Sequence, residues 1–129
     1  GEPSIIEMDV GIAYRGDVQI ELIQQTNDAP SPYRQFFREG RMGMHHLAFG
    51  SRDMDADLQK ARVFFFVIIC TIDAMIGRYA YFQDPAMPEN FFEFLAVTDE
   101  LEAFWQQSME EARHWDGSKP IRAMDLKGL

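Results

Sequence analysis

The stretch Phe91-Phe92-Glu93-Phe94-Leu95 places one carboxylate among four large apolar residues. A similar stretch, Gln19-Ile20-Glu21-Leu22-Ile23, lies near the start of the chain and also has a central Glu. Each stretch follows an Ala-Tyr pair, at residues 80–81 and 13–14. Short apolar runs bounded by turn residues are typical of β-strands. The matching order predicts an internal duplication in which the two Glu residues are equivalent.

The first half of the chain alternates apolar and polar residues in two successive runs. Residues 6–14 and 18–23 both show the period of two that indicates a strand, and Gly16-Asp17 between them predicts a tight hairpin turn. A polar linker follows. Residues 33–38 then predict a short helix that ends at Gly40.

The second half predicts a complete βαβββ unit. A helix capped by Asp53 is expected to end near Arg62. The expected strands are residues 44–49, 63–71, 78–83 and 91–97. A last helix is expected to begin after the capping residue Thr98 and to end at Gly117, before an extended or loose tail at 121–129.

Together the two halves predict an α+β fold of paired βαβββ modules, with the first module incomplete in this chain. Residues 1–40 would form the end of the first module and a linker, 41–97 the second module, and 98–129 the C-terminal helix and tail. Because half a module leaves sheet edges without a neighbour, we expect either a homodimer or a polypeptide that extends before Gly1.

Composition excludes several classes of protein. The chain has 129 residues, 47% of them hydrophobic, which fits one globular domain. Its formal net charge of −9 disfavours nucleic-acid binding. The single cysteine, Cys70, excludes an intrachain disulfide framework and fits a reducing, cytoplasmic location. No run of about 18 uncharged apolar residues predicts a membrane span, and residues 1–4 do not resemble a signal peptide.

Three residues are candidates for a metal site. Glu21 and Glu93 lie among apolar neighbours, where a carboxylate is costly unless it is paired, protonated or bound to a cation. His46 shares a predicted strand face with Met44 and Ala48, which are flexible or small. Two carboxylates and one imidazole suit Zn, Mn, Co, Ni or Fe(II). Alternatively, the histidine is a hydrogen-bonded structural residue and the glutamates face solvent.

Other polar or reactive residues carry weaker signals. Cys70 lies in an apolar strand and is expected to be inert packing. His45 alternates with His46 and should face the other way. His114 lies near the end of a helix, where a cation is favourable. Tyr14 and Tyr81 are expected in the core rather than in catalysis.

Four stretches, taken in order, carry a family resemblance. They are Val18-Gln19-Ile20-Glu21-Leu22-Ile23; Gly43-Met44-His45-His46-Leu47-Ala48-Phe49 with Asp53-x-Asp55-x-x-Leu58; Arg78-Tyr79-Ala80-Tyr81-Phe82; and Phe92-Glu93-Phe94-Leu95. They resemble the vicinal oxygen chelate superfamily of glyoxalases, bleomycin-resistance proteins and extradiol dioxygenases. The methylmalonyl-CoA epimerase and glyoxalase-like branch is the most similar. One departure is residues 62–66, where the family commonly has a Gly-containing turn.

The resemblance implies a curved mixed sheet around a concave site that holds a divalent metal ion. His46 matches the first-strand ligand of the second module, Glu93 its last-strand ligand, and Glu21 the equivalent ligand of the first module. The fourth ligand would lie on a strand that this chain lacks. Glu21 or Glu93 would also serve as the catalytic base.

The function implied is that of a glyoxalase-like lyase, or an isomerase or epimerase, acting on a small-molecule substrate. Removal of a proton next to a metal-chelated carbonyl is the step that these reactions share. An extradiol dioxygenase would instead need redox-active Fe(II). A non-catalytic drug- or antibiotic-binding protein of the same fold is the other alternative. The three candidate ligands favour the enzyme, because a sequestering site needs none.

Overall fold

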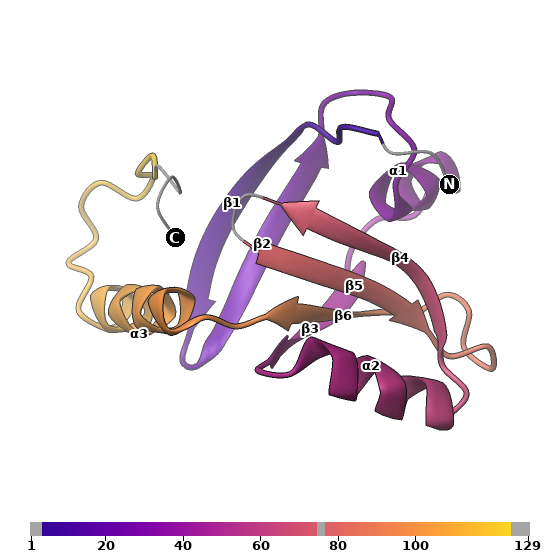
Figure 1. Cartoon of the computed structure of the whole chain (residues 1–129). Coiled ribbons are helices and arrows are strands. Elements are labelled where there is room, and N and C mark those ends of the chain that lie inside the picture. Colours follow the sequence, from indigo (N-terminus) through magenta and orange to yellow (C-terminus); the bar gives the residue numbers. More distant parts are fainter. Residues whose placement is uncertain (1–3, 75–76, 125–129) are drawn as a thin grey trace. The chain divides into compact units, whose positions relative to one another are not determined.

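The computed structural model describes residues 4–74 and 77–124 and confirms a mixed α+β fold. Contacts divide the chain into two units, Gly1–His45 with Gln107–Ser118, and His46–Gln106 with Lys119–Leu129. The elements are β1 (Met8–Arg15), β2 (Val18–Gln25), α1 (Pro32–Arg38), β3 (His46–Ser51), α2 (Met54–Val63), β4 (Val67–Ala74), β5 (Gly77–Gln83), β6 (Phe91–Ala96) and α3 (Asp99–Arg113), as labelled in Figure 1.

The first unit contains the predicted hairpin. Strands β1 and β2 pair antiparallel, with Arg15 opposite Val18 at the turn. Gly16 has a φ of 61°, in the left-handed region that glycine adopts without steric cost. The alternating pattern and the Gly-Asp turn were therefore sufficient to predict this element and its turn.

Helix α1 begins and ends with local capping interactions. The Ser31 hydroxyl accepts a hydrogen bond from the backbone N–H of Arg34. At the other end, the backbone N–H groups of Gly40 and Arg41 donate to Phe37 and Phe36. This is a Schellman motif, and Gly40 takes its left-handed position with a φ of 69°.

The second unit contains the predicted βαβββ arrangement. Its four strands lie in the order β3-β6-β5-β4. Strand β3 pairs parallel with β6, and the other two pairs are antiparallel, so the sheet is mixed. Parallel β3 and β6 are the first and last strands of the unit, which brings residues far apart in sequence side by side at one edge of the sheet.

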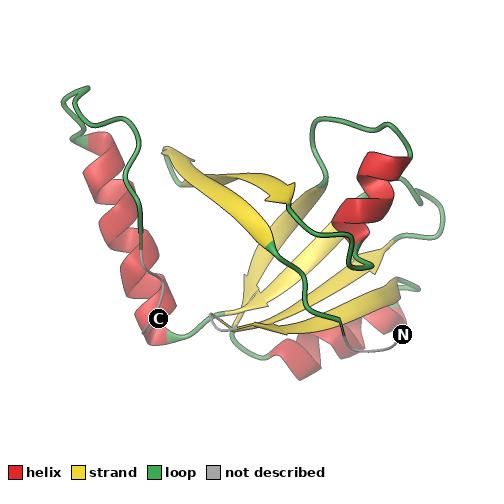
Figure 2. Cartoon of the chain, turned by 90° about the horizontal axis from the view of Figure 1, so that it is seen from above, coloured by secondary structure: helices red, strands yellow, loops and turns green. Residues whose placement is uncertain are grey.

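Helix α2 covers one face of this sheet (Figure 2). Asp53 caps it by accepting a hydrogen bond from the N–H of Ala56, as predicted. Its buried Met54 and Leu58 pack with Ala80 of β5. Ile68, Phe94 and Ala96 join this cluster. The cluster defines the α2 face of the sheet, and side chains in alternate positions belong to the opposite face.

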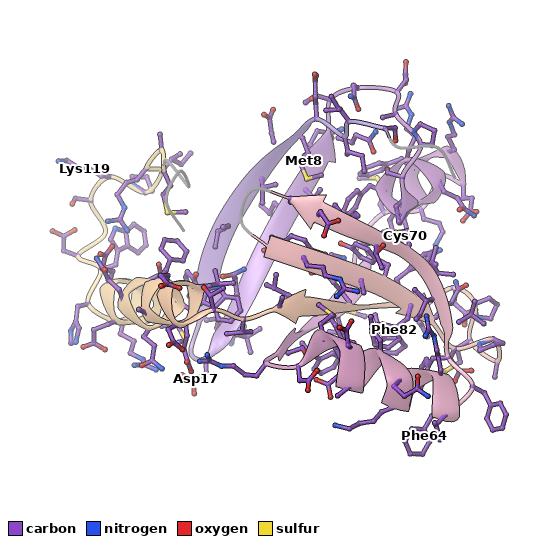
Figure 3. The ribbon with its side chains drawn as sticks, viewed as in Figure 1. Met8, Asp17, Phe64, Cys70, Phe82 and Lys119 are labelled. Carbon is purple, nitrogen blue, oxygen red and sulfur yellow. The ribbon has the colours of Figure 1, made fainter. Side chains whose placement is uncertain are left out.

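Strand β4 begins at Val67, four residues later than predicted, because α2 ends in a Schellman motif. The N–H groups of Phe65 and Phe66 donate to the carbonyls of Arg62 and Ala61. Phe65 occupies the left-handed position with a φ of 66°, where glycine is usual. Phe64, in the same turn, points away from the sheet (Figure 3).

Helix α3 begins where predicted and ends earlier. The Thr98 hydroxyl accepts a hydrogen bond from the N–H of Leu101. The helix ends at Arg113, and residues 114–124 lack regular structure. Of the tail expected at 121–129, residues 125–129 lie outside the described residues. Within the described part of the chain, no helix is both long and apolar enough to cross a membrane.

Candidate functional site

A buried polar pair lies on the four-stranded sheet, on the face opposite α2. His46 Nε2 lies 3.3 Å from Glu93 Oε2. The side chain of His46 is 10% exposed and that of Glu93 is 6% exposed. Burial of a carboxylate is costly, and a nearby imidazole offsets part of that cost. The structure therefore brings two of the three predicted ligands within contact distance of each other.

The register of β3 and β6 produces this pair. His46 lies opposite Phe91, and Ala48 lies opposite Glu93. Residues that lie opposite each other on paired strands share a face of the sheet, so His46 and Glu93 are diagonal neighbours on one face. Ala48 beside Glu93 is small and leaves room for the imidazole to approach the carboxylate.

Tyr81 supports the pair from the next strand. It lies directly opposite Glu93 in the β5–β6 register and is 1% exposed. Its ring meets the His46 imidazole edge to face, with centroids 5.3 Å apart. The sequence predicted a core tyrosine, and Tyr81 is buried. Its place beside Glu93 follows from strand register, which the sequence did not reveal.

Cys70 lies on the same face of the sheet as the pair, because a bulge changes the face of its side chain. Ile68 lies opposite Phe82, but Cys70 lies opposite Tyr81, so the register shifts between Ile68 and Cys70. The extra residue turns Cys70 away from the α2 face on which Ile68 packs. Burial raises the pKa of the Cys70 thiol, and the charge of Glu93 adds to this effect. The half-buried thiol on β4 is labelled in Figure 3.

His45 has a different environment in the first unit. Its ring centroid lies 5.0 Å from each of the rings of Tyr33 and Phe36 in α1. Burial is the main cause that lowers the pKa of His45. The His45 imidazole thus packs between two aromatic rings of α1.

Glu21 lies on β2 of the first unit, on a strand as the duplication argument required. The residue as a whole is exposed, and its Oε1 accepts a hydrogen bond of 2.7 Å from Gln19 Nε2. Partial burial raises the pKa of Glu21, while the bond from Gln19 acts in the opposite direction. A carboxyl group with a raised pKa is better matched to proton transfer near neutral pH.

His114 takes part in local helix-end interactions. Its Nε2 lies 2.9 Å from Glu110 Oε1, and both side chains are exposed. This contact lowers the pKa of Glu110. The position matches the sequence-based interpretation of His114 as a residue at a helix end.

The His46–Glu93 pair fits a metal site in donor type and spacing. Nitrogen and oxygen ligands of zinc lie about 2.0–2.2 Å from the ion, so two ligands of one ion lie roughly 3–4 Å apart. The observed separation of 3.3 Å falls in this range. In residues 4–74 and 77–124 no three His, Cys, Asp or Glu side chains are grouped so as to hold an ion. The pair thus supplies two donors of a candidate site.

The comparisons with known proteins identify the family. The family model described as the Glyoxalase/Bleomycin resistance protein/Dioxygenase superfamily matches residues 2–78. This range contains Glu21 and His46 and ends before Glu93. None of the curated proteins matches the chain. Since the match covers more than half of the sequence and agrees with the βαβββ unit, the chain belongs to the glyoxalase, bleomycin-resistance and dioxygenase superfamily.

Proposed function

We propose that this chain contributes to a metal-dependent site that removes a proton next to a carbonyl group of a small substrate. His46 and Glu93 would hold a divalent ion, and Glu21 would join them as a ligand or as the base. The reaction class would be that of a glyoxalase-like lyase, or of an isomerase or epimerase.

The observation that carries this proposal is the buried contact between His46 and Glu93. A purely structural histidine requires no carboxylate partner, and a buried carboxylate is rarely retained in a sheet without a role. Residues with one nitrogen and one oxygen donor suit Zn, Mn, Co, Ni or Fe(II). When bound, such an ion acts as a Lewis acid that makes the neighbouring C–H group of a coordinated carbonyl compound more acidic.

Glu21 is proposed as a ligand that can also serve as the base, and Glu93 as a fixed ligand. The raised pKa of Glu21, caused mainly by partial burial, favours accepting a proton from carbon near neutral pH. Its exposed surface also leaves room for a substrate. Glu93 is enclosed and contacts His46, which suits a fixed ligand. Glu21 enters the proposal through its equivalence to Glu93 in the sequence repeat and through the family resemblance.

Deuterium exchange tests the proposed proton transfer without requiring the natural substrate. The protein loaded with Zn²⁺ or Ni²⁺ is incubated in D₂O with small hemithioacetals and 2-methyl-3-oxo thioesters, and exchange at the carbon next to the carbonyl is followed by NMR. We expect exchange that depends on the metal ion and is lost in Glu21→Gln. Metal-loaded protein that binds these compounds and never exchanges the proton would favour the binding-protein alternative.

A further inference from the structure

A line of hydrogen bonds runs along the β1–β2 hairpin and ends at Glu21. The Tyr14 hydroxyl donates to Gln19 Oε1 over 2.7 Å. Gln19 Nε2 in turn donates to Glu21 Oε1 over 2.7 Å. The first length is usual for an O–H···O bond, and the second lies at the short end of the range for N–H···O bonds. The amide of Gln19 therefore links a phenol to a carboxylate.

Strand register places these three residues in line. Tyr14 lies directly opposite Gln19 in the hairpin. Gln19 and Glu21 are two residues apart in β2, so their side chains point to the same face. In the second unit, by contrast, Tyr81 lies directly opposite Glu93. The first hairpin is thus shifted by two residues relative to the second, and Gln19 fills the interval between the tyrosine and the glutamate.

The tyrosine determines which way the amide of Gln19 points. An amide group has one end that accepts hydrogen bonds and one end that donates them. Because the hydroxyl of Tyr14 donates to Oε1, the NH₂ end is directed toward Glu21. Burial raises the pKa of Tyr14, a side-chain hydrogen bond with Ser108 opposes this, and the charge of Glu21 adds to it. Tyr14 therefore remains a protonated donor at neutral pH.

We infer that Gln19 and Tyr14 are positioning residues for Glu21. Gln19 engages Oε1 and limits rotation of the carboxylate, which leaves Oε2 available to a metal ion or to a substrate proton. Tyr14 prevents the amide from turning its oxygen toward the carboxylate. This inference rests on the proposed function of Glu21 as ligand or base. It gives a role to Tyr14 and Gln19, to which neither the repeat nor the family resemblance assigned one.

The structural part of this inference is tested by NMR of the metal-free protein. The side-chain NH₂ signals of Gln19 are assigned by their loss in Gln19→Leu. We expect one of the two protons to be shifted downfield in the wild type and to return to the position of a solvated glutamine in Glu21→Ala. Gln24 is the matched control, because it lies on the other face of β2 and its Nε2 donates to the backbone of Gln25. Gln19 signals at solvated positions in the wild type would overturn the inference.

The functional part is tested by titration with Zn²⁺ against a chromophoric chelator. Loss of a residue that orients a metal ligand typically weakens metal binding 10- to 100-fold. We expect about 10-fold weaker binding in Gln19→Leu, a smaller loss in Tyr14→Phe, and no change in Gln24→Leu. Melting temperatures measured on the same samples without metal identify any variant that is merely less stable.

The outcomes separate this inference from the proposed function. Unchanged Zn²⁺ affinity in Gln19→Leu would overturn the positioning role while leaving the metal site intact. A wild-type protein that binds no Zn²⁺ would overturn the proposed function, and the NMR result would still decide whether Gln19 holds Glu21. Weaker Zn²⁺ binding in both Gln19→Leu and Tyr14→Phe, with melting temperatures preserved, would support both the positioning role and the proposed metal site.

Discussion

A double-mutant cycle on His46 and Glu93 measures the pair at the centre of the candidate site. The four proteins are the wild type, His46→Ala, Glu93→Gln and the double variant, all kept free of metal with a chelator. The two side chains are nearly buried and 3.3 Å apart. His46→Ala removes the imidazole from this contact, and Glu93→Gln removes the carboxylate charge while keeping the shape of the side chain. His46→Ala also removes the edge-to-face contact with Tyr81.

The cycle cancels losses that are not shared by the two residues. A polar contact that involves a charged group is worth about 1.5–3 kcal/mol, and coupling within one network is about 0.5–3 kcal/mol. We therefore expect a coupling energy of about 1–3 kcal/mol from urea denaturation followed by circular dichroism. The contact of His46 with Tyr81 does not enter this value, because the Glu93 substitution leaves the aromatic ring in place.

A second cycle, in which His45→Ala takes the place of His46→Ala, is the matched control. The ring of His45 packs on Tyr33 and Phe36, so His45→Ala should destabilise the protein by itself. Its effect should add to that of Glu93→Gln within about 0.5 kcal/mol. Additive behaviour of His46 and Glu93, or coupling as strong for His45, would refute the reasoning.

Three further predictions concern stability. Phe65→Gly should raise the free energy of unfolding by about 0.5–1 kcal/mol, because it relieves a left-handed φ that costs about 1–2 kcal/mol and loses little burial at 85% exposure. Gly40→Ala, at the equivalent left-handed position that ends α1, should lower the free energy of unfolding. Chemical denaturation of the two variants checks both predictions. Gly50→Ala should lower the melting temperature, because the new Cβ would lie 2.7 Å from Val97 Cγ2 and overpacking costs about 1–3 kcal/mol. Burial lowers the pKa of His45, so the folded state binds this proton less readily than the unfolded state. The free energy of unfolding should therefore fall as pH decreases below about 6.5 toward the lowered pKa. His45→Phe should flatten this slope in denaturation series from pH 7.5 to 5.

The elements that sequence reasoning predicted are those with local signals. Alternation and a Gly-Asp turn predicted the β1–β2 hairpin, and capping residues predicted the starts of α2 and α3. The βαβββ order followed from the same patterns, and so did the adjacency of His46 and Glu93 once the family resemblance placed them on the first and last strands.

The features that sequence reasoning missed depend on backbone geometry without a residue signal. The end of α2 near Arg62 was predicted, but a phenylalanine at the left-handed position of Phe65 gives no indication of the turn that follows, so the start of β4 was placed too early. The bulge before Cys70 reverses the face of a side chain that was expected to be inert packing because its strand is apolar. The bond between Tyr14 and Gln19 depends on a two-residue difference in register between the two hairpins, which similar sequences do not reveal.

Metal stoichiometry, measured by equilibrium dialysis against Zn²⁺ and elemental analysis, tests the central claim most directly. The wild type and His45→Ala should retain one ion per chain, and His46→Ala should lose it under the same free Zn²⁺ concentration. The two substituted histidines are neighbours in the sequence, but His46 contacts Glu93 whereas the ring of His45 packs on Tyr33 and Phe36. A wild-type protein without bound zinc, or equal retention by His46→Ala and the wild type, would contradict the account.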